Sequence, residues 1–311
     1  MCKKIPLAGA VVLITHTRVL HLSKVIESLA KAWTEPYSEL HVILHGNQNQ
    51  VKEVVESIKF IQPKILMVNR EYGISPQEAI SRNVFDGLNK AFLNTKIDFV
   101  TVLEDDIVVR SDFLDFNASV INMEIHNEKF KGINGFSGSK FDPSKDDLYS
   151  RFRYGFGWGW TIHRKYWEEV QKIWVRDFQT HWDALLEPNV RLGYVVMPHN
   201  SRIFNLGFDS SATHTQNGGN QRLALEASYH SNNMNFSRKH FRYSSFEVNW
   251  RKDVFKFLAP RDLFSKEVHF LFWINSRIHI SSKSNLLEEF FKSKFKGLLF
   301  KAIGYLSNSS K

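Results

Sequence analysis

Apolar and polar residues follow two different periods over the first hundred positions of the chain. Short runs rich in β-branched residues, such as residues 10–14, are typical of buried strands. Between these runs apolar residues recur at helical spacing, as at Leu22, Val25 and Leu29. The pattern predicts strands at residues 10–14, 40–44, 64–69 and 99–103, and helices at residues 19–33, 50–60 and 75–93.

Strands that alternate with helices form parallel βαβ units, so the pattern predicts an α/β fold. In open sheets of this kind ligands bind beyond the carboxyl ends of the strands. Three predicted strands are followed directly by polar residues, at 15–18 (Thr-His-Thr-Arg), 45–47 (His-Gly-Asn) and 104–106 (Glu-Asp-Asp). We expect these three segments to meet at one edge of the sheet. This half of the chain has neither a GxGxxG nor a GxxxxGK[ST] motif, which argues against a dinucleotide fingerprint and a P-loop.

Three adjacent carboxylates, Glu104, Asp105 and Asp106, follow the fourth predicted strand. Adjacent carboxylates repel one another unless a cation or a basic group offsets their charge. A hard divalent cation with oxygen ligands would do so, and it would be shared with a substrate diphosphate. The alternative is a solvated acidic turn or a helix N-terminus, which the helix dipole favours. The position of the triplet at a strand end favours the metal site.

Two later segments are candidates for sugar chemistry. Residues 151–160 alternate glycine with large aromatic residues, and flat aromatic rings can stack on sugars where glycine lets the backbone approach. A glycine-rich strand in an aromatic core has the same composition, so both interpretations stay open. Further on, Asp183 follows Trp182, although a lone aspartate is more often a helix cap or a surface residue than a catalytic base.

The order of these motifs resembles the N-acetylglucosaminyltransferase I family of GT-A glycosyltransferases over about residues 10–215. The motifs that carry the resemblance are Thr-x-Arg after the first strand, the triplet followed by Asp112-Phe113, Gly155-Phe156-Gly157-Trp158, Trp182-Asp183, Pro188, Arg191-x-Gly193, Pro198, Ser201-Arg202 and Gly207. The resemblance implies a GT-A fold, in which a Rossmann-like nucleotide-sugar-binding half (1–110) is joined to an acceptor half (111–215). It also implies a manganese-bound UDP-sugar donor and an inverting reaction.

The resemblance further implies roles for individual residues. Asp106 would ligate Mn²⁺ or Mg²⁺, His214 would lie near the metal or the diphosphate, and Asp183 would be the general base on the acceptor hydroxyl. Contacts to the nucleotide-sugar are expected from Thr15, Arg18, Asn47, Glu104 and Asp105, and contacts to the acceptor or the sugar from Gly157, Trp158, Trp182 and Arg202. Where the family has an acidic residue that reads uracil, this chain has residues 45–47, and Asn47 is the nearest substitute.

Charge is distributed unevenly along the chain. Its 311 residues carry a net charge of +9, and residues 216–311, with 16 basic and 7 acidic side chains, hold the whole surplus. Such a basic, aromatic extension suits an anionic partner, of which nucleic acid is the least favoured because no recognised motif is present. At about residues 286–306 apolar residues fall largely on one helical face. This predicts an amphipathic helix that either lies on an anionic membrane surface or covers the protein's own core.

The sequence therefore predicts a metal-dependent, inverting glycosyltransferase that acts on a glycan or lipid-linked glycan. One alternative is a metal-dependent nucleotidyltransferase, which would usually have a glycine-rich, lysine-bearing loop where this chain has residues 15–18. The other is a noncatalytic glycan-binding or membrane-adaptor protein. The chain has a single cysteine, Cys2, and its first apolar run is better interpreted as a strand than as a signal peptide. Both features indicate a cytoplasmic location, which would be peripheral on the inner face of the membrane if the C-terminal helix binds lipid.

Overall fold

The computed structural model describes residues 7–46, 48–69, 73–137, 142–152, 158–175, 178, 193–207 and 242–243. All of them belong to the first of two units, Met1–Pro260. The second unit, Arg261–Lys311, lies outside the described residues, and so does the amphipathic helix predicted near residues 286–306. Its membrane and core interpretations therefore both stay predictions.

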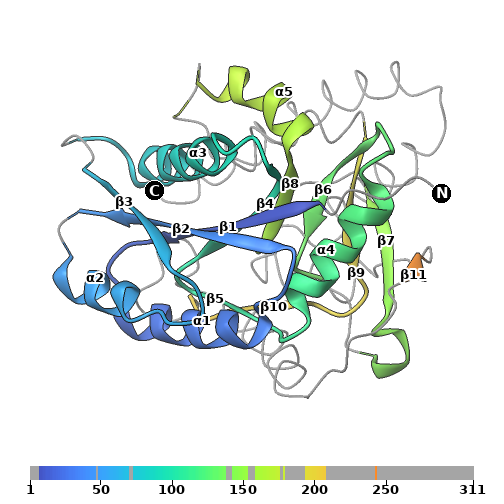
Figure 1. The fold of residues 1–311 in the computed structure, drawn as a ribbon, viewed down its shortest axis with the longest axis horizontal. Coiled ribbons are helices and arrows are strands. Elements are labelled where there is room, and N and C mark those ends of the chain that lie inside the picture. Colours follow the sequence, from blue (N-terminus) through green and yellow to red (C-terminus); the bar gives the residue numbers. More distant parts are fainter. Residues whose placement is uncertain are drawn as a thin grey trace, which may run out of the picture. The chain divides into compact units, whose positions relative to one another are not determined.

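A nine-stranded sheet forms the centre of the fold, in the order β11-β7-β9-β6-β8-β4-β1-β2-β3 (Figure 1). Four parallel strands make up one side of it and confirm the predicted βαβ array: β1 (Ala8–Thr15), β2 (Tyr37–His45), β3 (Pro63–Val68) and β4 (Ile97–Glu104). The other side is mixed: β6 (Phe130–Asn134), β7 (Leu148–Phe152), β8 (Trp160–His163), β9 (Tyr194–Pro198) and β11 (Arg242–Tyr243). β8 runs antiparallel to both β4 and β6, so the ends of β4 and β6 and the start of β8 share one edge.

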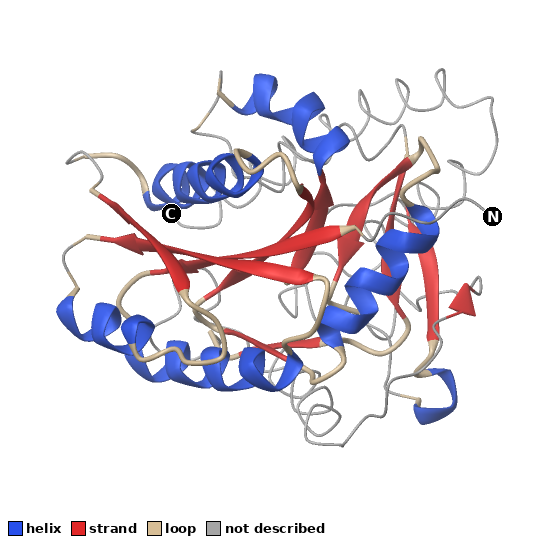
Figure 2. Ribbon diagram, in the orientation of Figure 1, coloured by secondary structure: helices blue, strands red, loops and turns tan. Residues whose placement is uncertain are grey.

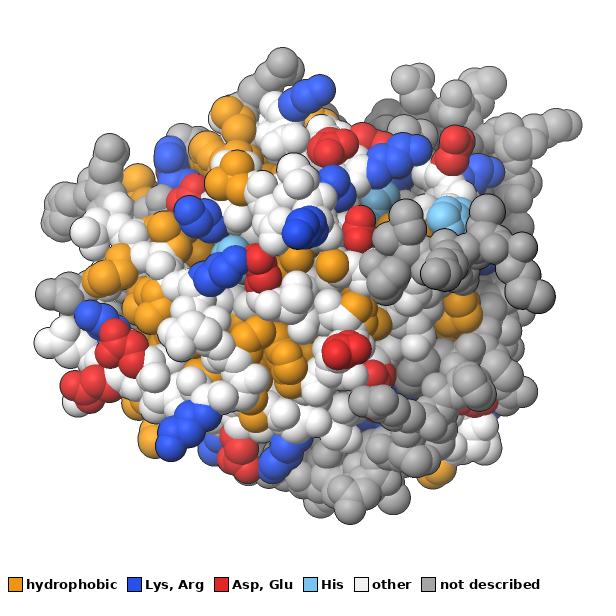
Figure 3. Space-filling model, viewed as in Figure 1, with side chains coloured by type: hydrophobic (Ala, Val, Ile, Leu, Met, Phe, Trp, Pro, Cys, Tyr) orange, Lys and Arg blue, Asp and Glu red, His pale blue; other side chains and the backbone are white. Residues whose placement is uncertain are grey.

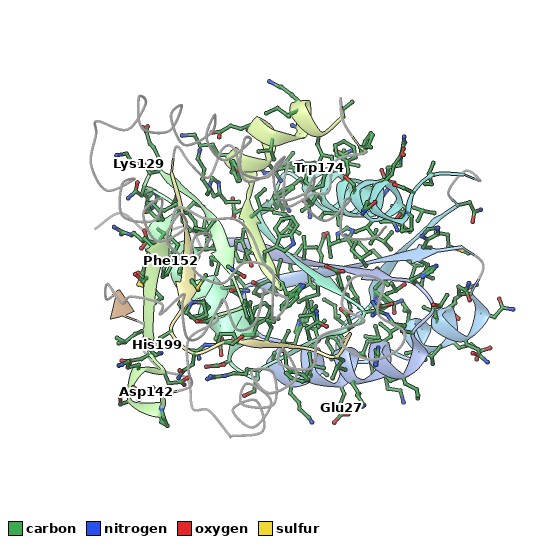
Figure 4. All side chains as sticks on the ribbon, turned by 180° about the vertical axis from the view of Figure 1, so that it is seen from behind. Glu27, Lys129, Asp142, Phe152, Trp174 and His199 are labelled. Atoms are coloured by element: carbon green, nitrogen blue, oxygen red, sulfur yellow. The ribbon has the colours of Figure 1, made fainter. Side chains whose placement is uncertain are left out.

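Helices cover both faces of the sheet (Figure 2). One face is covered by α1 (Val19–Ala32), α2 (Asn49–Glu56) and α4 (Phe113–Glu124), and the other by α3 (Pro76–Phe92) and α5 (Arg164–Trp174). Successive side chains of β1 point to opposite faces. Leu13 thus belongs to the core under α1, and Val12 belongs to the core under α3. Trp174 joins α5 to α3, because its indole N–H donates to Ser81 Oγ at 2.8 Å (Figure 4).

The helix predicted at residues 50–60 ends earlier than its apolar pattern suggests. In the structure α2 stops at Glu56, and the Ser57 N–H closes the last turn on the carbonyl of Glu53. Phe60 and Ile61 still pack against the core, but they do so from the connection to β3. Apolar residues that are buried from an irregular segment continue the helical spacing here, so the predicted helix extends past the observed end of α2.

A buried charge cluster ties the acidic triplet to the second half of the fold. The strand β5 (Ile107–Val109), directly after the triplet, pairs with β10 (Ile203–Asn205). At the ends of this ribbon Arg110 and Arg202 are fully buried, and both donate to Asp146 Oδ1, at 2.8 and 2.9 Å. Arg110 also binds Asp112 through two hydrogen bonds of 3.0 and 2.8 Å. Two arginines and two aspartates thus compensate one another, and the two arginines hold the pKa of Asp146 well below its usual range even though burial opposes this shift.

We expect Asp146→Asn to destabilise the protein strongly. Removing one partner of a buried ion pair leaves an uncompensated charge, which costs about 3–5 kcal/mol. Asp142 is a matched control on the same loop, because its side chain is 35% exposed and pairs with Lys145 at the surface. Denaturant unfolding of both variants measures the difference. Equal stabilities for Asp146→Asn and Asp142→Asn would contradict a structural role for the cluster.

Basic and acidic side chains are interspersed over the face seen in Figure 3, in keeping with the 25 basic and 25 acidic residues in positions 1–215. Among the helices that the structure describes, none is long and apolar enough to cross a bilayer.

Candidate active site

The polar segments after β1, β2 and β4 do meet at one edge of the sheet. β1 lies between β2 and β4, and its last residues, Ile14 and Thr15, align with Glu104 and Leu44. The His16 N–H donates to Asp105 Oδ2 at 2.9 Å, and the His16 and His45 rings lie 5.1 Å apart. The sequence prediction that these segments meet at one edge of the sheet is therefore confirmed for their described residues, while Asn47 lies outside them.

Arg18 is the residue that binds the acidic triplet most closely. It is the N-cap residue of α1, and its guanidinium bridges two carboxylates, at 2.8 Å to Asp106 Oδ2 and 2.6 Å to Asp105 Oδ1. Burial opposes the charged form of Arg18, but the two carboxylates outweigh this and keep its pKa raised. The β1–α1 loop thus places one positive charge among three negative ones.

Asp105 and Asp106 differ in how their oxygens are used. Both oxygens of Asp105 accept hydrogen bonds within the protein, from Arg18 and from the His16 backbone. Asp106 shares only Oδ2 with Arg18, and its Oδ1 is buried without a hydrogen-bond partner among the described residues. Burial raises the pKa of Asp106, and the charge of Asp105 adds to this shift, whereas Arg18 opposes it.

An orphaned carboxylate oxygen of this kind fits a divalent cation. Mg²⁺-like ions are commonly bound through one or two carboxylates plus substrate phosphates. Within the described part of the chain no group of three or more His, Cys, Asp or Glu side chains is arranged to hold a metal by itself. Asp106 would thus hold the cation together with a ligand's oxygens.

Gly207 closes this site from the β10 side. The Leu206 N–H donates to the Asp106 carbonyl at 2.7 Å, and the Gly207 N–H donates to Asn205 Oδ1 at 2.6 Å. A Cβ atom at position 207 would overlap Asp106 Oδ2 and would come within 3.1 Å of Arg18 Nη1. Only glycine leaves room for the ion pair here.

Trp158 reaches the same edge from the second half of the sheet. It lies two residues before Trp160, which aligns with Val102 of β4 and Asn134 of β6. Its ring meets the Phe136 ring edge-on at 5.2 Å, and both side chains are partly exposed. This position is compatible with the sugar contact expected of Trp158.

Two residues expected to bind the ligand are structural instead. The Thr15 hydroxyl is buried and donates to the Ile43 carbonyl at 2.9 Å, so it is not offered to a nucleotide-sugar. Arg202, expected to contact the acceptor or the sugar, has no exposed surface and belongs to the buried cluster with Asp146. A sequence motif does not distinguish an arginine that faces a ligand from one that neutralises buried carboxylates.

Several expected site residues fall outside the described residues, so their positions stay predictions. They are Asn47, Gly157, Trp182, Asp183 and His214. Conversely, the sequence pattern predicts no individual role for His16, whose backbone N–H binds Asp105. Arg110 and Asp146 were not predicted either, although a charged residue directly after the apolar run at 107–109 was a usable signal.

The chain is similar in sequence to a protein of known name over part of its length. This relative is an alpha-1,3-mannosyl-glycoprotein 2-beta-N-acetylglucosaminyltransferase of Arabidopsis thaliana. The two sequences are 22% identical over 214 residues, which cover 66% of this chain and 48% of that protein. The chain thus spans about half the length of this relative.

Solved structures with a similar fold include S. aureus TarS, with a TM-score of 0.47 and 13% identity over 64% of this chain and 36% of that one. For the structure of S. aureus TarS 1–349 in complex with UDP the TM-score is 0.44 and the identity 12%, and the match covers 63% of this chain and 59% of that one. For the 4-diphosphocytidyl-2C-methyl-D-erythritol synthase of Anaerococcus prevotii the TM-score is 0.43 and the identity 9%, and the match covers 72% of this chain and 96% of that one. With TM-scores below 0.5, these likenesses carry no functional argument.

A protein-family model gives the wider match. The model of the GNT-I family covers residues 3–256, which extends beyond residue 215, the limit of the resemblance found in the sequence. Part of the stretch interpreted as a C-terminal extension thus falls within the family match. The match and the described sheet confirm the α/β fold of GT-A type that the sequence predicts. The chain belongs to the GNT-I family.

Proposed function

We propose that the protein is a glycosyltransferase that moves a sugar from a UDP-linked donor to a hydroxyl of a glycan or lipid-linked glycan, with inversion at the anomeric carbon. The observation that carries this proposal is the Arg18–Asp105–Asp106 constellation, with its orphaned carboxylate oxygen, at the carboxyl edge of the sheet in a GNT-I family chain. Ligands of open α/β sheets bind at this edge.

The residues of the chain divide the chemistry between two sites. Asp106 would hold Mn²⁺ or Mg²⁺ with the diphosphate, and the cation, when bound, supplies Lewis-acid stabilisation of the negative charge on the leaving group. Arg18 offers the diphosphate a second positive contact, and a guanidinium suits phosphate oxygens because it can donate two parallel hydrogen bonds. His214 is proposed near the same group on the family resemblance alone.

Asp183 is proposed as the general base on the opposite side of the donor sugar. The acceptor hydroxyl gives its proton to this carboxylate while its oxygen bonds to the anomeric carbon, and the bond from that carbon to the diphosphate breaks. One such in-line displacement inverts the configuration. Trp158, Trp182 and Gly157 are proposed to line the sugar or acceptor site, since aromatic rings stack on sugar faces.

The partners follow from the same assignment. The donor is a nucleotide-sugar and the acceptor a glycan or lipid-linked glycan, and nucleic acid is not expected. An anionic membrane surface remains a proposal that rests on the sequence of residues 283–311, which carry six lysines and two glutamates. Co-sedimentation with anionic vesicles tests it, because a chain that ends before residue 283 should stay in the supernatant.

A thermal-shift screen tests the proposed function directly. Nucleotide-sugars with different bases are added to the full chain with and without Mn²⁺. We expect a UDP-sugar to raise the unfolding midpoint only with the metal, since a ligand at 100 times its Kd stabilises the native state by about 2.7 kcal/mol. A shift with nucleoside triphosphates but not with nucleotide-sugars would favour a nucleotidyltransferase, and no shift with any of them would favour a noncatalytic protein.

A further inference from the structure

The guanidinium of Arg18 contacts both Asp105 and Asp106, and it lies where a divalent cation would also be attracted. Its side chain is 25% exposed, whereas those of Asp105 and Asp106 are 4% and 10% exposed. The negative side of this ion pair is thus enclosed by protein, and the positive side borders solvent.

The Asp105 carboxylate and the Asp106 backbone are positioned without the help of Arg18. Asp105 accepts a hydrogen bond from the His16 backbone at 2.9 Å, and the Asp106 carbonyl accepts one from Leu206 at 2.7 Å. Gly207 packs directly against Asp106 Oδ2. Because these contacts involve the backbone of the β1–α1 loop and the segment after β10, the Asp105 carboxylate and the backbone of Asp106 would stay in place if the guanidinium moved, and Gly207 would still limit the room beside Asp106 Oδ2.

The guanidinium, in contrast, is held by little else. The backbone of Arg18 is anchored by its carbonyl, which accepts from the Leu22 N–H at 2.9 Å, while its side chain makes no capping hydrogen bond to α1. Among the described residues, its side-chain hydrogen bonds go to the two aspartates. A long side chain on a fixed backbone can change partners by rotating about its own bonds.

A divalent cation on Asp106 would change the balance of charge. In the structure two carboxylates, those of Asp105 and Asp106, face one guanidinium, and His21 is a further group that acts on Asp106 electrostatically. A cation bound at Oδ1 would compete with Arg18 for the charge of the same carboxylate, and like charges at this separation repel. Release of the guanidinium toward an incoming diphosphate would relieve this repulsion.

We propose that Arg18 is an exchangeable counter-ion: it neutralises Asp105 and Asp106 while the site is empty, and it turns to the diphosphate when a divalent cation takes Asp106. This inference rests on the proposed function and adds to it a coupling between metal and nucleotide. Each ligand then favours the binding of the other, and the coupling is reciprocal because both act on one equilibrium. Arg18 is in this sense a positioning residue as well as a ligand-binding one.

The test is Arg18→Gln in the full chain, with Mn²⁺ binding measured by electron paramagnetic resonance in the absence of nucleotide. Removal of the competing charge should tighten Mn²⁺ binding about fivefold or more, which is the lower end of typical coupling effects. At saturating Mn²⁺ the same variant should bind UDP about tenfold more weakly, since it loses a charged contact to the phosphates. Arg18→Lys keeps the charge and should return the Mn²⁺ affinity toward that of the wild type.

Arg151→Gln is a matched control at the opposite edge of the sheet. Arg151 is 38% exposed and pairs with the buried Glu124 at 2.9 Å, so its removal also breaks an arginine–carboxylate pair. It should leave Mn²⁺ binding unchanged. If the wild type shows metal-dependent UDP binding but folded Arg18→Gln binds Mn²⁺ no more tightly than it does, the counter-ion role is overturned. If the wild type binds neither UDP nor Mn²⁺, the proposed function itself fails.

Discussion

Asp106→Asn should remove metal-dependent donor binding while the protein stays folded. The substitution keeps the shape that packs against Gly207, and asparagine can still accept a hydrogen bond from Arg18, so the change is mainly one of charge. The orphaned oxygen would no longer be part of a carboxylate, and hard divalent cations prefer charged oxygen ligands. We expect the affinity for a UDP-sugar in Mn²⁺ to fall by roughly 100-fold, about 2.7 kcal/mol, because the cation that would join the diphosphate to the protein loses its charged protein ligand.

Calorimetric titration of the donor in the presence of Mn²⁺ measures this loss. Asp98→Asn is the matched control, because Asp98 lies on the same strand at the opposite edge, where it accepts a hydrogen bond from the Ala8 backbone at 2.8 Å. It should bind the donor like the wild type. Unchanged donor affinity in folded Asp106→Asn would remove Asp106 as the metal ligand.

Asp183→Asn should lower the rate of sugar transfer by about 10²–10⁴-fold, the usual contribution of a general base. Asparagine cannot take the acceptor proton, but it differs little from aspartate in size, so donor binding should persist. The expected signature is therefore a fall in kcat at nearly constant donor affinity. This separates Asp183 from Asp106, whose loss acts on the donor itself.

Single-turnover transfer from a radiolabelled UDP-sugar, beside a donor titration of the same sample, checks both parts of this signature. Glu187, the next acidic residue along the chain, offers the comparison variant Glu187→Gln, which should turn over at the wild-type rate. A normal rate in Asp183→Asn combined with a large loss in Glu187→Gln would move the base to Glu187.

The sheet and its functional edge could be predicted from the sequence because both depend on local patterns. A strand such as β1 is buried on both faces, and this produces the continuous apolar run at residues 10–14 that marks it. Parallel strands then bring the residues that follow them to one edge. This topology brings Arg18 beside the triplet although they are 87 and 88 positions apart in the chain, but the ion pair itself was not predicted from the sequence, which assigned Arg18 to the nucleotide.

The division of labour within the site could not be predicted in the same way. Arg18 and Arg202 have the same side chain and both precede apolar residues, yet one borders solvent and the other is fully buried. That difference depends on Asp146, which reaches Arg202 only through tertiary packing. Likewise, only the fold shows that Asp105 is satisfied on both oxygens while Asp106 is not.

The edge of the sheet formed by Arg18, Asp105 and Asp106 is proposed to bind a nucleotide-sugar together with a divalent cation. Calorimetric titration of UDP into the full chain, once in Mn²⁺ and once in excess chelator, tests it most directly. We expect saturable binding of one UDP per chain in Mn²⁺ and a large loss of that binding in chelator. A folded chain that binds no UDP in Mn²⁺, or that binds it equally well in chelator, would contradict it.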